Sequence, residues 1–347
     1  MLKSPAEIKK ILIVRLSALG DVTLLVPVIR TLQQALPHAQ ITWLTSRGAY
    51  ALLEGLDGVE FIVIDKPNSL SAYYQIKKQF GSRHFDLLFA MQASLRANLI
   101  YPLIRADLKI GFDRERARDG QWLFTDQRIE HAQQHLLDSF FAFLTPLGIT
   151  QHELTWNIPI PPEAVAWAQR ELPTQRPLLA INPGASKEER NWHSQGYATV
   201  IETAAQRWGT TAVLTGGPSE RELKLGAEIE AQISSPLINL IGKTTPKQLA
   251  ALLAQVDCLL APDTGPVHIA VAMGTPVVGL YAVAPAKLSG PYLYPQLVVD
   301  KFDEAVRTLL HQDPATLPWR TRVHDSRAMQ LIQPAEVLEK MALLFDR

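Results

Sequence analysis

Residues 256–281 of the sequence read VDCLLAPDTGPVHIAVAMGTPVVGLY, and this stretch decides the fold. The apolar run 256–261 has the length of a strand, and Pro262 ends it. Thr264 is a favourable N-cap residue for a helix. Pro266 follows in the first turn, where a backbone N–H has no partner within the helix, so the N–H that proline lacks costs little. The helix continues to Met273, and a second strand is expected at 277–281. The pattern predicts a strand, a tight turn, a helix and a further strand.

A helix that begins directly after a strand presents unpaired backbone N–H groups and the positive end of its dipole. Such a turn is suited to bind a phosphate or a pyrophosphate. The hexapeptide Asp263-Thr-Gly-Pro-Val-His268 forms the expected turn here. The sequence therefore points to a nucleotide ligand in the C-terminal half of the chain.

The first half of the sequence alternates between strand-like and helix-like segments. Apolar runs predict strands at 11–16, 41–44, 61–64, 86–90 and 108–111, and helical spacing predicts helices at 22–36, 70–80 and 95–104. The run 11–16 is almost continuously apolar, which is typical of a parallel strand covered on both faces. The alternation predicts a parallel sheet with helices on both sides.

A polar, proline-rich connector at 150–162 separates this series from a second one. The second series has expected strands at 177–181, 212–214, 237–240, 258–261 and 277–281, and expected helices at 196–208, 219–233, 246–254 and 267–273. The predicted fold class is α/β, with two Rossmann-like, doubly wound domains facing a central cleft. We expect an N-terminal domain at 1–160, a C-terminal domain at 161–330, and a helix in 331–347 that packs back on the N-terminal domain. A ligand is expected in the cleft, at the carboxyl ends of the strands.

Composition excludes several classes of function. The chain has 347 residues, which suggests about two domains, and its 34 basic and 34 acidic residues give no general attraction to nucleic acid. The single cysteine, Cys258, lies in an apolar strand and predicts a buried thiol in a reducing compartment. No apolar run reaches the ~20 residues of a membrane-spanning helix, so membrane contact would be peripheral. These features predict a cytoplasmic protein.

Asp21 follows the first strand in the sequence Ser17-Ala-Leu-Gly-Asp21. Gly20 permits a tight turn, after which Asp21 lies at the start of a helix. One interpretation is that the carboxylate only caps this helix. The other is that it faces the cleft as a general base for an acceptor hydroxyl.

The turn after the first strand of the second domain reads Asn182-Pro-Gly-Ala-Ser-Lys-Glu-Glu-Arg190. Ser186 and a cation, either Lys187 or Arg190, could bind a pyrophosphate, or the loop could simply be solvated. Glu220 opens the helix after the next strand and could accept hydrogen bonds from a ribose. It is equally compatible with an ordinary acid in the first turn of a helix.

His268 lies in the first turn of the helix described at the outset and could either pack against the sheet or donate to a phosphate. Asp263 and His268 do not make a metal site by themselves, and the sequence has no Asp-x-Asp pattern. The sequence therefore predicts no divalent metal.

Six cations gather in one region of the first domain, namely Arg96, Arg105, Lys109, Arg114, Arg116 and Arg118. Such a cluster is usually a solvated face, but beside the cleft it could receive an anionic acceptor or the headgroups of a membrane. The downstream aromatic residues Trp122, Phe124, Phe140, Phe141 and Phe143 are expected in the core.

Taken together, three motifs resemble those of glycosyltransferase family 9, the ADP-heptose:lipopolysaccharide heptosyltransferases. The motifs are Ile11-Leu-Ile-Val-Arg-Leu-Ser-Ala-Leu-Gly-Asp21-Val, Asn182-Pro-Gly-Ala-Ser186 with Arg190-Asn-Trp192, and Asp263 to His268 with Gly274-Thr-Pro276. The third motif is the most specific, and the resemblance spans nearly the whole chain. It implies a GT-B architecture in which the N-terminal domain takes the acceptor and the C-terminal domain takes the ADP-sugar.

The resemblance also assigns expected roles to single residues. Asp21 falls on the proposed catalytic base, Ser186 and Arg190 on residues that bind the diphosphate, and Glu220 on the residue near the adenosine ribose. Asp263 falls on a residue near the heptose hydroxyls, and Thr264, Gly265 and His268 on the diphosphate site. Ala185 and Arg190 depart from the family, which commonly has a hydroxyl residue and a lysine there. The expected acceptor residues are Ser17, Gly20, Arg96, Arg114 and Arg116.

The implied reaction is an inverting, metal-independent transfer of L-glycero-D-manno-heptose from ADP-heptose, without a cofactor. The expected acceptor is the Kdo sugar of the anionic inner core of lipopolysaccharide, at the cytoplasmic face of the inner membrane. A heptose or another inner-core acceptor is the alternative. A transferase with another donor, a sugar-nucleotide epimerase and a non-catalytic nucleotide-sugar-binding protein are further alternatives. An NAD-dependent oxidoreductase is disfavoured because neither first-strand turn contains Gly-x-Gly-x-x-Gly.

Overall fold

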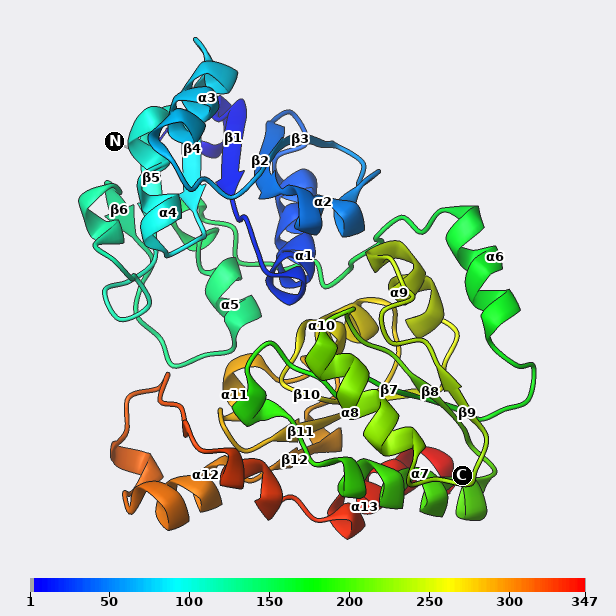
Figure 1. The fold of residues 1–347 in the computed structure, drawn as a ribbon. Helices are drawn as coiled ribbons and strands as arrows, with labels where there is room; N and C mark the ends of the chain where they lie inside the picture. The colour runs from blue at the N-terminus through cyan, green and yellow to red at the C-terminus, as the bar shows by residue number, and fades with distance from the viewer. Residues whose placement is uncertain (1–2, 347) are drawn as a thin grey trace. The chain divides into compact units, whose positions relative to one another are not determined.

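The computed structural model describes residues 3–346 and divides the chain into two compact units, Met1–Pro159 and Ile160–Arg347. The boundary falls one residue before the expected one, within the proline-rich connector. Each unit is described by itself below. Both are built on a six-stranded parallel sheet with helices on its two faces (Figure 1).

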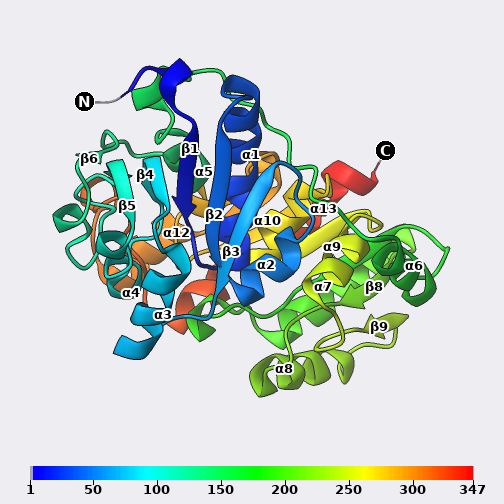
Figure 2. The same ribbon diagram turned by 90° about the horizontal axis from the view of Figure 1, so that it is seen from above.

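The sheet of the first unit has the strand order β3-β2-β1-β4-β5-β6. The strands are β1 (Lys10–Val14), β2 (Gln40–Ser46), β3 (Val59–Ile64), β4 (His84–Ala90), β5 (Arg105–Gly111) and β6 (Gln127–Arg128). Figure 2 shows this order directly, with β1 between β2 and β4. It is the order of a classical dinucleotide-binding fold. Ile11 pairs with Ile41 on one side and Leu87 on the other, so β1 lies in the buried centre of the sheet.

The helices of the first unit are α1 (Leu19–Ala35), α2 (Arg47–Leu53), α3 (Leu70–Phe80), α4 (Leu95–Asn98) and α5 (Leu136–Phe141). α1 packs against α2 and α5, whereas Ile76 and Phe80 of α3 share a core with the strands and with Ala97 of α4. The helix expected at 95–104 is shorter than predicted. It ends at Asn98 and a separate 3₁₀ turn follows at Tyr101–Leu103, because Pro102 cannot continue an α-helix.

The sheet of the second unit has the order β12-β11-β10-β7-β8-β9, which is the same topology. The strands are β7 (Leu178–Ile181), β8 (Thr211–Leu214), β9 (Leu237–Asn239), β10 (Cys258–Pro262), β11 (Val277–Tyr281) and β12 (Val298–Asp300). β12 was not predicted, because three residues are too few to show a strand pattern. Cys258 is fully buried as expected, and burial raises the pKa of its thiol to about 12.

The helices of the second unit are α6 (Pro162–Glu171), α7 (Ser194–Trp208), α8 (Glu220–Glu230), α9 (Pro246–Leu253), α10 (Gly265–Ala272), α11 (Ala286–Ser289), α12 (Phe302–Ala305) and α13 (Pro334–Phe345). α7 packs against α8 and α13, and α9 packs against α6 and α10. The expected C-terminal helix is present as α13, and its expected packing on the first domain stays a prediction. Val337 and Met341 of α13 are buried in the core of the second unit, where α13 contacts α7 and β12.

Both sheets change winding direction at a defined pair of strands. In the first unit the two central strands β1 and β4 lie side by side, and in the second unit β7 and β10 do so. The loops that follow the two strands of such a pair run in opposite directions. A crevice opens between them at the carboxyl ends of the strands, and ligands bind there. The motif residues Asp21 and Asp263 follow β1 and β10, so each motif lies at one of these two crevices.

Candidate functional site in each unit

The two motifs of the second unit meet at the carboxyl ends of β7 and β10. Nη1 of Arg190 lies 3.2 Å from Oδ2 of Asp263, and both side chains are largely buried. Nε of Arg190 has no hydrogen-bond partner within residues 3–346. A guanidinium with an unpaired, buried donor at a ligand crevice is suited to bind an oxyanion.

The loop that carries Arg190 is held by its own polar side chains. Asn182 is buried and donates through Nδ2 to the carbonyl of Gly184 at 2.7 Å. Asn191 Oδ1 accepts the N–H of Ala185 at 2.7 Å. Ser186 and Lys187 lie between these anchors and are exposed. The structure thus leaves Ser186 accessible and gives Arg190, not Lys187, the buried position at the crevice.

Asp263 is fixed from a second direction by α11. Ser289 Oγ donates to Asp263 Oδ1 at 3.2 Å, so the two carboxylate oxygens have different partners. Ser289 is itself held, because the hydroxyl of the buried Tyr281 donates to its carbonyl at 3.1 Å. Asp300 accepts the N–H of Ala286 at the other end of this short helix, at 2.9 Å. Sequence reasoning missed Ser289, since nothing near it in the chain marks a site.

The N-terminus of α10 lies directly behind Asp263. Thr264 is the N-cap with an extended backbone, as predicted, but its hydroxyl makes no cap hydrogen bond within the described chain. Gly265 is the first helical residue, and His268 is 6 % exposed in the first turn. The first-turn N–H groups therefore face the crevice without the usual side-chain cap, which favours an anion there.

The turn after β8 contains two acids with different surroundings. Glu220, the expected ribose partner, is the first residue of α8 and is exposed. Glu222, which the sequence analysis did not single out, accepts the N–H of Gly217 at 2.9 Å and the hydroxyl of Ser219 at 2.7 Å. A Cβ on Gly184 would lie 2.6 Å from Cγ of Glu222. Glu222 thus braces the strand-end turns, and Glu220 is left accessible to a ligand.

In the first unit Asp21 lies at the third position of α1 and is paired with Arg15 from the preceding strand end. Its Oδ2 accepts from Nη2 of Arg15 and from the N–H of Ala18, the latter at 3.0 Å. The bond to Ala18 shows that Asp21 does cap its helix. Both bonds use Oδ2, so Oδ1 has no hydrogen-bond partner among residues 3–346 and is able to accept a proton.

Arg15 is a functional candidate that the sequence analysis did not assign. It is 8 % exposed, donates to the carbonyl of Met91 at 2.5 Å and lies over the ring of Phe140 at 5.2 Å. It therefore joins the ends of β1 and β4 to Asp21. A cation within an otherwise apolar strand was the available signal, because buried arginines need partners.

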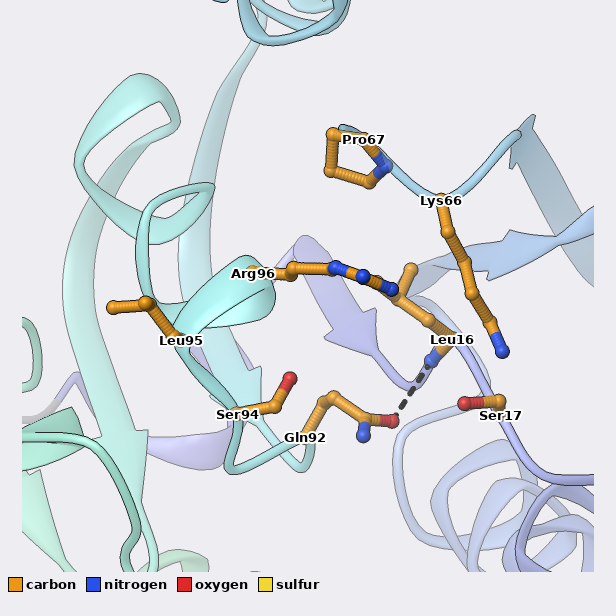
Figure 3. Close-up of a pocket in the computed structure, with 8 residues that line it drawn as sticks. All are labelled: Leu16, Ser17, Lys66, Pro67, Gln92, Ser94, Leu95 and Arg96. Carbon is orange, nitrogen blue, oxygen red and sulfur yellow. Dashed lines mark hydrogen bonds between the residues drawn. The ribbon is translucent and has the colours of Figure 1, made fainter. Parts of the chain in front are cut away.

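A pocket of about 400 Å³ opens beside the ion pair of Arg15 and Asp21. It is lined by Leu16, Ser17, Lys66, Pro67, Gln92, Ser94, Leu95 and Arg96. Figure 3 shows Lys66, Arg96 and Ser17 converging on it from three different elements. Gln92 Oε1 accepts the N–H of Leu16 at 3.3 Å and ties the ends of β1 and β4 together. Two cations and three neutral polar side chains suit an anionic, hydroxyl-rich ligand.

The expected acceptor residues do not all reach this pocket. Ser17 and Arg96 line it, whereas Gly20 is buried in the first turn of α1. Arg114 is exposed and lies over the ring of Trp122 at 5.8 Å. Arg116 is buried, with Nε 2.7 Å from Oδ2 of Asp113, so the structure assigns it to holding its own loop.

Trp122 and Lys66 lie in surroundings that the sequence did not suggest. Trp122 was expected in the core but is 39 % exposed, because it lies on a surface 3₁₀ turn, Gln121–Leu123. Lys66 was not predicted as a site residue and lines the pocket. Lys66 follows β3, and only the strand order shows that the end of β3 lies near the ends of β2 and β1.

Within residues 3–346, no group of three or more His, Cys, Asp or Glu side chains is arranged to bind a metal ion. No helix in that same range is both long and apolar enough to cross a bilayer.

Two tandem Rossmann-like units with parallel six-stranded sheets have the GT-B fold. Residues 73–312 match glycosyltransferase family 9 (heptosyltransferase). The chain is also 34 % identical to the lipopolysaccharide core heptosyltransferase OpsX of Haemophilus influenzae, over 97 % of each chain. This chain therefore belongs to glycosyltransferase family 9, and it is a heptosyltransferase.

Solved structures support the fold. A family 9 glycosyltransferase from Veillonella parvula superposes with a TM-score of 0.80 at 22 % identity, covering 98 % of both chains. The Escherichia coli heptosyltransferase WaaC with ADP gives a TM-score of 0.72 at 18 % identity, covering 96 % of this chain and 99 % of that one. At these identities the likeness establishes the architecture and leaves the substrates to be argued from the site.

Proposed function

We propose that this protein transfers L-glycero-D-manno-heptose from ADP-heptose to an anionic sugar of the lipopolysaccharide inner core, with Kdo as the acceptor. The observation that carries the proposal is that one unit holds the largely buried Arg190 near the start of α10, while the other holds Asp21 and a cationic pocket. The 34 % identity to a lipopolysaccharide core heptosyltransferase, and the ADP bound to a relative of the same fold, agree with it.

The proposed chemistry is a single displacement with inversion at the anomeric carbon. The acceptor hydroxyl forms the new C–O bond, and its proton passes to Oδ1 of Asp21, the oxygen without a partner among residues 3–346. The bond between the anomeric carbon and the diphosphate oxygen breaks, and its electron pair leaves with ADP. Arg15 holds Asp21 through Oδ2, which directs the other oxygen toward the acceptor.

The donor's diphosphate is assigned to the second unit. Arg190 and the N–H groups at the start of α10 would balance the charge that grows on the leaving ADP, and Ser186 would add a hydroxyl. Because a guanidinium and a helix N-terminus supply this positive charge, we propose that the transfer needs no metal ion. Glu220 is assigned to the adenosine ribose, Asp263 to the heptose hydroxyls, and Thr264, Gly265 and His268 to the diphosphate.

The acceptor is assigned to the pocket of the first unit. Lys66 and Arg96 would bind the carboxylate or phosphate groups of an inner-core acceptor, and Ser17 and Gln92 its hydroxyls. The exposed Arg114 would meet more distant negative charge of the same molecule. An acceptor that is anchored in the inner membrane requires the enzyme to work peripherally at the cytoplasmic face.

The deciding experiment is a transfer assay with ADP-heptose and a panel of truncated lipopolysaccharide cores, read by mass spectrometry. We expect one heptose to be added to the core that ends in Kdo. Transfer only to cores that already carry heptose would replace Kdo by heptose as the acceptor. Binding of ADP-heptose without transfer to any core would overturn the assignment of this reaction.

Asp21→Asn tests the proposed base in the same assay. We expect kcat to fall by roughly 10²–10⁴-fold while ADP binding, measured by calorimetry, stays nearly unchanged. Glu163→Gln is a matched control, because Glu163 is also an acid in the first turn of a helix and lies outside both crevices. Full turnover in the Asp21 variant would remove this residue from the mechanism.

A further inference from the structure

Helices α3 and α4 expose large apolar side chains that the core of the first unit does not use. Leu70 and Tyr74 of α3 are 89 % and 65 % exposed, and Leu95 and Leu99 beside them are 58 % and 41 % exposed. On α3 the buried residues Ile76 and Phe80 lie on a different side of the helix from Leu70 and Tyr74. The core therefore gives no reason for apolar residues on the outer side.

The two helices are neighbours in space. The hydroxyl of Tyr73 in α3 donates to the carbonyl of Arg96 in α4 at 3.1 Å. The exposed apolar residues therefore lie on neighbouring elements. We refer to Leu70, Tyr74, Lys77, Lys78, Leu95 and Leu99 together as the α3–α4 face.

The α3–α4 face is locally basic in a chain with no net charge. Residues 66–80 and 92–104 contain Lys66, Lys77, Lys78 and Arg96 but no Asp or Glu. All four cations are exposed. One carboxylate lies beside the face, because Asp119 Oδ2 accepts the N–H of Leu95 at 2.8 Å. Exposed leucines and a tyrosine with an excess of lysines are typical of surfaces that lie in the interface of an anionic bilayer.

The same segments line the candidate acceptor pocket. Leu95, Arg96 and Lys66 contribute to the pocket wall, while Leu95 also projects from the exposed surface (Figure 3). The pocket and the α3–α4 face therefore share Leu95. A soluble sugar would gain nothing from this arrangement, whereas a sugar anchored in a membrane needs the pocket to open beside the bilayer.

We propose that the α3–α4 face binds the anionic surface of a lipid bilayer, with Leu70, Tyr74, Leu95 and Leu99 inserted among the headgroups and Lys77 and Lys78 paired with lipid phosphates. The placement beside the acceptor pocket rests on the proposed function. Binding to a bilayer does not require catalysis, so the two can fail separately.

A fluorescent label placed on the face tests the insertion directly. The single native cysteine is fully buried, so Leu70→Cys and Leu95→Cys can each be labelled selectively with an environment-sensitive dye. We expect a blue shift with vesicles of phosphatidylcholine and phosphatidylglycerol, and little change with phosphatidylcholine alone. Leu223→Cys is the control, because Leu223 is also exposed, at 48 %, but lies on α8 of the second unit. An equal shift at all three positions, or none at any, would overturn the proposal.

Vesicle flotation of charge variants tests the electrostatic part. Lys77→Glu/Lys78→Glu should weaken binding to the same anionic vesicles by about tenfold or more, because two attractive charges become repulsive. Lys224→Glu on the exposed surface of α8 should not. Neither lysine of the double variant lines the pocket, so transfer to a deacylated, soluble acceptor should stay unchanged.

Kinetics with two forms of the acceptor separate this inference from the proposed function. The double variant should raise KM for acceptor embedded in vesicles and leave KM for the soluble acceptor unchanged. An equal rise in both values would show that the α3–α4 face acts on the sugar and not on the bilayer. Vesicle binding by an enzyme that transfers no heptose would instead contradict the proposed function and leave the membrane surface standing.

Discussion

Nη1 of Arg190 and Oδ2 of Asp263 lie 3.2 Å apart, which joins two motifs separated by 72 residues of sequence. In the proposed reaction these two side chains have different ligands, the diphosphate for Arg190 and the sugar for Asp263. Because their proposed ligands differ, the two residues are separable by experiment.

Arg190→Ala and Asp263→Ala should affect ADP differently. Arg190→Ala removes a charge-assisted partner of the diphosphate and should raise the Kd of ADP by about tenfold or more. Asp263→Ala frees Arg190, so the Kd of ADP should stay equal or fall, while the KM of ADP-heptose rises. Calorimetry with ADP and kinetics with ADP-heptose measure the two effects. Loss of ADP binding in both variants would indicate that the ion pair only holds the loop.

Ser289→Ala tests whether the orientation of Asp263 matters. The substitution removes the hydrogen bond to Oδ1 of Asp263 but keeps the bond that Tyr281 makes to the backbone of residue 289. We expect a fall in kcat of a few fold to about tenfold with little change in melting temperature or ADP affinity. Thr308→Ala is a control that removes another hydroxyl of the second unit, one that donates to the carbonyl of Glu304 at 2.8 Å. A matching loss of ADP affinity would indicate a general disturbance of the crevice.

Arg15 is expected to act through Asp21 without touching the substrates. Arg15→Met leaves the carbonyl of Met91 without this donor and Asp21 without its cation, so unfolding free energy should fall by about 1–3 kcal/mol. Below the melting temperature, kcat should drop by at least about tenfold at unchanged donor KM. Arg15→Lys should recover part of kcat. A loss of stability with kcat equal to that of the unsubstituted enzyme would show that Arg15 has only a structural role.

Gly184→Ala tests the packing of the donor loop on Glu222. The new Cβ would lie 2.6 Å from Cγ of Glu222, which is too close without movement of that side chain. We expect weaker binding of ADP and a lower melting temperature. Gly148→Ala is a poor match because its φ is positive, whereas Gly48→Ala is a suitable control with nothing within 4 Å of the added Cβ. Unchanged ADP affinity in Gly184→Ala would show that the Glu222 side chain can move away from the added Cβ.

Asp86 should make the stability of the first unit sensitive to acid. Burial raises the pKa of Asp86, but hydrogen bonds from Nζ of Lys3 and from the N–H groups of Lys9 and Lys10 outweigh it and lower the pKa to about 2. Since the folded pKa lies below the unfolded one, this stabilisation is complete above about pH 4 and is lost as the pH falls toward 2. Asp86→Asn should cost about 1–2 kcal/mol at neutral pH and flatten this dependence. Thermal melts between pH 2 and pH 7 measure it, and parallel curves for both proteins would contradict the assignment.

Local sequence patterns accounted for the central strands and the position of the motif turns. The runs at 11–16 and 258–261 lie at β1 and β10, because parallel strands buried on both faces need continuous apolar residues. Phe140, Phe141 and Phe143 are buried as expected. The short β12 and the break after α4 were not predicted, since three residues show no period and Pro102 interrupted an apparent helical pattern.

The chemistry-bearing residue types were visible in the sequence, but their partners were not. Arg114 and Arg116 look alike in the chain, yet one is exposed over Trp122 and the other is buried against Asp113. Likewise, no pattern distinguishes Ser289 as a neighbour of Asp263 or α13 as part of the second core.

The sequence by itself determined the α/β class, the two-unit division and the motifs that mark a family 9 glycosyltransferase, because these depend on short-range periodicity and on residues at fixed spacing. Only the tertiary structure decided which cation faces which carboxylate, that Arg15 supports Asp21, and that Lys66 shares a pocket with Arg96. Those relationships join strand ends distant in sequence, and packing brings such ends together at the switch point of each sheet.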